Sequence, residues 1–262
     1  MVVQSPLEFI LKRDRLVVLA GLAGVTVLAW VYLFVLAADM SGMNMGGAMT
    51  SMQVKPWSGL DFLLMFLMWA VMMIGMMVPS AAPMILLFAL FARKKREENK
   101  PYVPVGAFAS GYLIVWTAFS AVAVVLQWGL EQATLLSPMM VSASPYLGGS
   151  LLIAAGIYQF TPLKNVCLKH CRSPFGFIAL HWRPGAWGGL RMGIHHGAFC
   201  VGCCWVMMTL LFVGGVMNLL WVAAIAAFVL VEKVLPRGPL TGRITGVALV
   251  GWGLWLLVSA LA

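Results

Sequence analysis

The sequence predicts an all-α protein of the membrane-embedded class, a polytopic bundle of about seven transmembrane helices. Of its 262 residues, 62% are hydrophobic and only 10% are charged, and the mean hydropathy is +0.97. Soluble domains are about 45–50% apolar and about 25% charged. A chain this apolar has too few polar residues to cover a water-soluble core. An ordinary soluble enzyme and a disordered chain are therefore both excluded.

Seven apolar segments approach the length of roughly 20 residues that a spanning helix needs. We expect the helices at residues 16–37, 60–92, 103–129, 145–163, 190–214, 217–233 and 242–261. The second segment contains Pro79 and Pro83, which predict a tilt or a kink. Between the fifth and sixth segments, residues 214–218 are the only ones that could form the turn.

These segments form one integral membrane domain over residues 1–262. The first apolar segment is too long for a signal peptide, so we expect it to remain as an anchor. The predicted parts are an N-terminal anchor helix within residues 1–37, a Met-rich external loop at 38–58, and the core helices at 59–262.

The positive charges indicate the orientation of the bundle. With the N-terminus in the cytoplasm, 16 of the 17 Lys and Arg residues lie on the cytoplasmic side, and only Lys55 lies outside. This is the asymmetry of the positive-inside rule. It predicts an integral membrane protein with its N-terminus inside and its C-terminus outside. The net charge of +9 thus reflects topology and lipid headgroups, with no nucleic-acid partner expected.

Methionine is concentrated in two places. The predicted external loop contains a group of Met residues that we expect to capture a metal ion, Met40, Met43, Met45, Met49 and Met52. In the second helix, Met72 and Met76 belong to a row of Met residues on one face. Thioethers are soft ligands that suit Cu(I). The alternative is that these side chains simply fill irregular gaps in helix packing.

Cysteine and histidine converge on two cytoplasmic half-helices. If the segment after Pro162 is helical, Cys167, His170 and Cys171 share one side of it. The fifth helix carries a stripe of four candidate ligands, flanked by His195 and Cys204: His196, Cys200, Cys203 and Met207. The fourth histidine, His181, lies in the loop between the two groups.

This ligand chemistry favours copper. The cysteine count is odd and the thiols lie on the reducing side or inside the bilayer, so a disulfide framework is not expected. Thiolate and imidazole together select Cu(I), zinc or an iron–sulfur centre. The spacings differ from those of zinc ribbons and ferredoxins, and Cu(I) tolerates such irregularity. Zinc and iron remain alternatives, as does a role for the thiols as small buried hydrophobes.

Three blocks of the sequence resemble a known family. They are residues 69–83 (WAVMMIGMMVPSAAP), residues 159–174 (QFTPLKNVCLKHCRSP), and residues 197–204 (GAFCVGCC) with the Trp-Val-Met-Met that follows. They resemble the bacterial family of predicted metal-binding integral membrane proteins over about residues 60–235. The resemblance implies a multi-pass protein of the bacterial inner (cytoplasmic) membrane and a bound metal, without a ligand list.

The two halves of the core also resemble each other weakly. The second helix contains Trp69-Ala-Val-Met-Met, and the fifth contains Trp205-Val-Met-Met. This match suggests a 3+3 inverted repeat after the first helix, an arrangement that places sites at the midplane.

Four functions remain open. The first is transport or delivery of Cu(I), with weak thioether ligands outside, stronger thiolates inside, and a copper chaperone as partner. The second is a subunit of a larger membrane complex that holds a fixed copper centre. The third is a membrane thiol redox protein, although the predicted outer loops contain no cysteine. The fourth is a purely structural bundle. No catalytic motif is seen, so non-enzymatic metal handling is favoured.

Two acidic residues have simpler interpretations. Asp61 is expected to stabilise the N-terminus of the second helix. Glu232, beside Lys233, is expected to form an interfacial ion pair.

Overall fold

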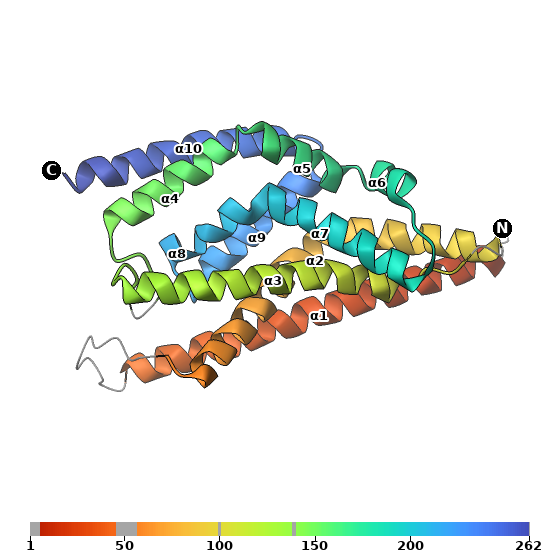
Figure 1. The fold of residues 1–262 in the computed structure, drawn as a ribbon, viewed down its shortest axis with the longest axis horizontal. Helices are drawn as coiled ribbons and strands as arrows, with labels where there is room; N and C mark the ends of the chain where they lie inside the picture. Colours follow the sequence, from red (N-terminus) through yellow and green to blue (C-terminus); the bar gives the residue numbers. More distant parts are fainter. Residues whose placement is uncertain (1–5, 46–56, 99–100, 138–139, 262) are drawn as a thin grey trace, which may run out of the picture.

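The computed structural model describes residues 6–45, 57–98, 101–137 and 140–261, and in this part every regular element is an α-helix (Figure 1). The helices are α1 (Pro6–Met45), α2 (Gly59–Glu97), α3 (Val105–Gln132), α4 (Pro145–Tyr158), α5 (Pro162–Arg172), α6 (Pro174–His181), α7 (Gly185–Thr209), α8 (Leu211–Gly214), α9 (Leu219–Val234) and α10 (Gly238–Ser259). The all-α prediction is confirmed for the described residues.

Five helical segments of the described chain are long and apolar enough to cross a membrane. They are Arg15–Asp39, Gly59–Glu97, Val105–Gln132, Gly185–Gly214 and Gly238–Ser259. A sixth span results if α4 and α5, which meet at an angle of 64°, are counted together. Helix α9 has 16 residues and a length of about 24 Å, short for a hydrocarbon core of about 30 Å. Seven spans and the predicted orientation remain predictions.

The first helix is longer than the sequence suggested. It continues to Met45 rather than ending near residue 37, because Met and Ala are favourable in helices and the Gly-Gly pair comes only afterwards. The backbone at Met40, Met43 and Met45 is therefore helical. Met49 and Met52 lie outside the described residues.

Helix α2 begins with a capping box. The Ser58 hydroxyl oxygen accepts a hydrogen bond from the Asp61 backbone N–H, and the Asp61 carboxylate accepts one from the Ser58 N–H at 2.8 Å. This confirms the role expected of Asp61. Pro79 and Pro83 lie within α2, and the helix changes direction between its orange and yellow parts in Figure 1.

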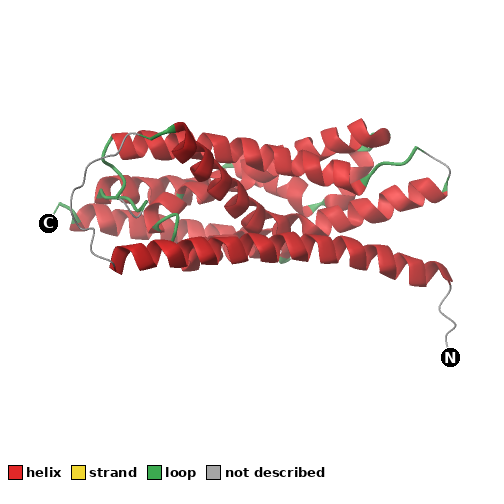
Figure 2. Cartoon of the chain, turned by 90° about the horizontal axis from the view of Figure 1, so that it is seen from below, coloured by secondary structure: helices red, strands yellow, loops and turns green. Residues whose placement is uncertain are grey.

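The helices pack in adjacent pairs along an elongated bundle (Figures 1 and 2). Helix α3 lies beside α7, α4 beside α10, and α1 beside α2. Glycine allows the α3–α7 pair to approach closely, since a Cβ at Gly111 would collide with the Leu190 carbonyl oxygen and one at Gly193 with the Phe108 carbonyl oxygen. The close approach brings Tyr112 of α3 against α7.

The centre of the bundle is rich in sulfur. The Met side chains of α2 that lie there are at most 2% exposed: Met68, Met72, Met73, Met76 and Met77. Large apolar side chains of α1, including Val17 and Leu28, point outward instead. The Met row therefore faces the interior, and α1 offers an apolar outer surface.

Candidate metal centre

Two cysteines from different helices meet where α5 crosses α7. The Sγ atoms of Cys171 and Cys203 are 3.9 Å apart. Zinc–sulfur bonds of about 2.3 Å at a tetrahedral angle would separate two sulfurs by about 3.8 Å. The two thiols are therefore close enough to share one soft metal ion.

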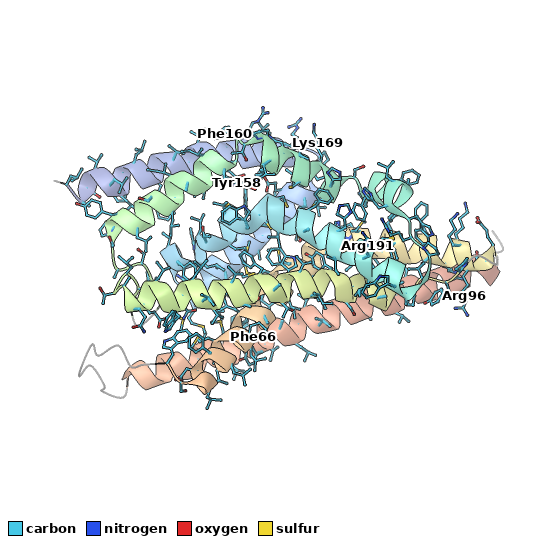
Figure 3. The ribbon with its side chains drawn as sticks, in the orientation of Figure 1. Phe66, Arg96, Tyr158, Phe160, Lys169 and Arg191 are labelled. Carbon is cyan, nitrogen blue, oxygen red and sulfur yellow. The ribbon has the colours of Figure 1, made fainter. Side chains whose placement is uncertain are left out.

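Local sequence explains how α5 reaches this position. Helix α4 ends at Tyr158, and α5 starts at Pro162 after the 64° bend, with Thr161 capping the Lys164 backbone N–H. The segment that carries Cys167, His170 and Cys171 is thus helical, which is the condition for these three residues to share one side of it. Figure 3 labels Tyr158 and Phe160 at the end of α4 and Lys169 on α5, on either side of the bend.

Cys200 lies deeper in the same cluster. Its Sγ atom accepts a hydrogen bond from the Lys233 ammonium at 2.9 Å and lies 3.2 Å from the Tyr112 hydroxyl. The thiols of Cys203 and Cys204 donate to the Cys200 carbonyl oxygen at 3.1 and 2.9 Å. Four of the five cysteines are thus joined in one network.

His196, on the same helix as Cys200, has a ring nitrogen that could serve as a metal ligand. It is 3% exposed and lies one helical turn before Cys200, among the rings of Phe108, Tyr112 and Phe177. Its Nδ1 atom is buried and has no hydrogen-bond partner among the described residues. A buried polar atom without a partner is costly. His196 therefore presents an unpartnered nitrogen on α7, one helical turn from Cys200.

The structure does not bring all predicted ligands to this point. His170 stacks on Phe199 with ring centroids 4.1 Å apart, and its Nδ1 contacts the Val166 carbonyl oxygen. The His195 ring lies against His181 and Phe199. These three histidines thus gather around aromatic rings.

Cys167 and Met207 have partners of their own. The Cys167 thiol packs against Gly202, where a Cβ would come within 2.7 Å of its sulfur. The Met207 sulfur accepts a hydrogen bond from the Gln159 amide at 3.0 Å.

The cluster is an open arrangement. Within the described ranges, no group of three or more His, Cys, Asp and Glu side chains has the geometry of a complete metal site. The chain instead offers two neighbouring sulfurs with Cys200 and His196 close by. Such a low-coordinate arrangement suits a soft monovalent ion better than an ion that requires four fixed ligands.

The Met row of α2 leads to the same cluster. Met72 and Met76 are followed one turn later by Ser80, whose hydroxyl accepts a hydrogen bond from Lys233 at 3.1 Å. The Met77 carbonyl oxygen accepts one from Tyr112 at 3.1 Å. Both contacts join α2 to side chains that touch Cys200.

Sequence reasoning missed the buried charges near this site. The Lys164 ammonium lies 2.5 Å from the Glu232 carboxylate and also donates to the Gln159 side chain. Lys164 and Glu232 are 1% and 2% exposed. The ion pair expected of Glu232 is present, but it is buried and its partner is Lys164. The neighbouring Lys233 points elsewhere, because consecutive helical residues point about 100° apart. The sequence did contain a signal for this buried pair, because ionisable residues next to apolar membrane segments are rare and usually have a partner.

Comparison with known proteins adds one result. No curated protein and no solved structure shows a significant match. Residues 66–256 match the copper-chaperone family PpoB2, a region that includes the Met row from Met68 onward, all five cysteines and Lys233. The match extends over most of the chain, and it agrees with the soft-ligand chemistry at the meeting of α5 and α7. The chain belongs to the PpoB2 family of copper chaperones.

Proposed function

We propose that this protein is a membrane-embedded copper chaperone that binds Cu(I) between Cys171 and Cys203 and passes the ion to an acceptor. The single observation that carries the proposal is the 3.9 Å separation of these two sulfurs, which come from different helices. The family supports copper handling in general. The oxidation state and the ligands are our assignment.

The chemistry of delivery follows from an open site. Thiolates are soft ligands that select Cu(I), and each thiol must lose its proton when the ion binds. Two sulfurs leave open coordination positions on the ion, so a sulfur of an acceptor can replace one thiolate at a time, beginning at the half-buried Cys171. We propose that Cys200 and the Nδ1 of His196, which lie one helical turn apart on α7, hold the ion during that exchange.

We also propose a route by which the ion reaches the thiols. Met72 and Met76 are buried in the bundle and lie along α2 before Ser80, which is linked to Cys200 through Lys233. Neutral thioethers bind Cu(I) more weakly than thiolates, so an ion entering along this row would move toward tighter ligands. The external Met residues remain the proposed capture site, and uptake remains the proposed direction.

A fixed copper centre in a larger membrane complex is the second candidate function. The buried position of Cys200 and Cys203, each 1% exposed, favours slow exchange and hence this alternative. Cu(I) that leaves the purified protein for a small thiol within minutes supports delivery. Cu(I) that stays bound under these conditions supports the fixed centre.

The ligand assignment is tested by anaerobic Cu(I) titration of the detergent-purified protein against a competing chelator. Cys171→Ser and Cys203→Ser should each weaken binding by about tenfold or more, or at least about 1.4 kcal/mol, because a hydroxyl is a poor ligand for a soft ion. Cys167→Ser is the matched control on α5, since its sulfur packs against Gly202. It should retain wild-type affinity. Unchanged affinity in the Cys171→Ser, Cys203→Ser double variant would remove this pair from the ligand set.

A further inference from the structure

We infer that Lys233 is a specificity-determining residue that makes the thiol site prefer monovalent Cu(I) over divalent ions such as Zn(II). This inference rests on the proposed function, because it concerns the ion held by the same thiols. It assigns a role to a buried cation, whereas the proposed function concerns the sulfur ligands.

The ammonium of Lys233 lies directly against the thiol cluster. Its Nζ atom is 2.9 Å from the Cys200 sulfur and 3.1 Å from the Ser80 hydroxyl oxygen, and the residue is 8% exposed. The same sulfur contacts the Tyr112 hydroxyl. A metal ion that contacts the Cys200 sulfur would therefore lie beside a fixed positive charge, and Cys203, whose thiol donates to the Cys200 carbonyl oxygen, belongs to the same network.

The neighbouring charges are already paired with each other. Glu232, the residue before Lys233, points toward Lys164, and their charged groups are 2.5 Å apart. The Arg172 guanidinium donates to the backbone carbonyl oxygens of Glu232 and Pro236, at 2.6 and 2.9 Å. In the described part of the chain, the hydrogen-bond partners of the Lys233 ammonium are a sulfur and a hydroxyl. No carboxylate among them offsets its charge.

A fixed charge discriminates between ions by their valence. Cu(I) and Zn(II) have the same d10 electron count and both bind thiolates, but they differ in charge. A neighbouring ammonium repels a divalent ion twice as strongly as a monovalent one at the same position. At about 5 Å and an effective dielectric constant of about 20, the extra repulsion lowers relative Zn(II) affinity by on the order of 100-fold. A merely structural lysine would leave the ratio of the two affinities unchanged.

The test is the ratio of Cu(I) to Zn(II) affinity, measured by anaerobic competition titrations on the full-length protein in detergent. Lys233→Gln removes the charge without adding a sulfur ligand, so it should lower this ratio by at least about tenfold. Lys233→Arg keeps the charge and should keep the ratio near the wild-type value. Ag(I), a monovalent ion that is stable in air, should follow Cu(I) in every variant.

Two further variants keep the test decisive if Lys233→Gln folds poorly. Ser80→Asp places a carboxylate beside the ammonium and should lower the ratio while leaving the lysine in place. Lys164→Gln with Glu232→Gln removes a buried pair without changing the net charge, and it should not move the ratio.

The outcomes separate the two proposals. If the wild-type protein fails to bind Cu(I) at its thiols, the proposed function fails. If it binds Cu(I) but Lys233→Gln and Ser80→Asp keep the wild-type ratio, only the inference about Lys233 is overturned. A loss of ratio in Lys233→Arg as large as in Lys233→Gln would also overturn it, because packing and not charge would then be responsible.

Discussion

At the scale of single residues, the inner half of the molecule contains an ion pair enclosed by apolar helices. Lys164 and Glu232 are almost fully buried, and Lys164 also lies over the Phe228 ring. Burying two charges costs free energy that only good pairing recovers, and removing one partner leaves the other unpaired at a cost of about 3–5 kcal/mol. The pair joins α5, which carries Cys171, to α9, which carries Lys233.

We therefore expect Glu232→Gln to destabilise the protein strongly, because the Lys164 ammonium loses its carboxylate. The double variant Lys164→Gln, Glu232→Gln should be more stable than Glu232→Gln alone, since two amides can hydrogen-bond to each other without a buried charge. Thermal unfolding of the purified variants in one detergent measures both effects. Additive losses in the double variant would mean that the two side chains do not stabilise each other.

At the scale of helices, the site depends on how closely α3 and α7 approach. Gly111 and Gly193 face each other there, and a Cβ at Gly111 would collide with the Leu190 carbonyl oxygen and approach the Ile194 nitrogen. Tyr112 follows Gly111 directly and reaches Cys200 across this contact. The glycine contact therefore sets the distance between the tyrosine hydroxyl and the thiol.

This predicts opposite effects for two glycine substitutions in α3. Gly111→Ala should destabilise the protein and weaken Cu(I) binding, because the clash is with backbone atoms that must move together. Gly106→Ala is the matched control, since no atom lies within 4 Å of its Cβ position. Alanine is favoured over glycine in a helix by about 1 kcal/mol, so the control should be neutral or stabilising. Equal melting temperatures for the two variants would contradict the close contact.

The helices were largely predictable, whereas the contacts between them were not. Hydropathy located α2, α3 and α10 because each segment has the length and composition that the bilayer requires. The stripe that carries Cys200 and Cys203 was also visible in the sequence, since one helix fixes it. The contact between Lys233 and Cys200 could not be predicted, because it joins α9 to α7. Periodicity within one helix does not show which other helix packs against it. Pro162 marks the place of the bend after α4, but its angle of 64° was not predictable from the sequence.

At the scale of the whole molecule, the bundle has two different ends. The two termini lie at opposite ends of it (Figures 1 and 2). Arg96 and Arg191 both lie in the half that contains the N-terminus (Figure 3). Lys164 and Lys233 are buried in the site, so they no longer count as loop charges. The remaining basic residues still favour one side, which supports N-in, C-out as the predicted orientation.

The orientation also tests how many helices cross the membrane. The five long spans alone give an odd number of crossings, and the number stays odd if the bent α4–α5 pair and α9 both cross as well. In either case the termini lie on opposite sides of the membrane. If only the bent pair or only α9 crosses, the number becomes even and the termini share a side.

We expect a C-terminal alkaline phosphatase fusion to be active and a C-terminal green fluorescent protein fusion to be dark. Fusions after Glu98, at the basic end of α2, serve as the control and should give the reverse pattern. A fluorescent C-terminus with a normal control would show that one of the two elements, α9 or the bent pair, does not cross.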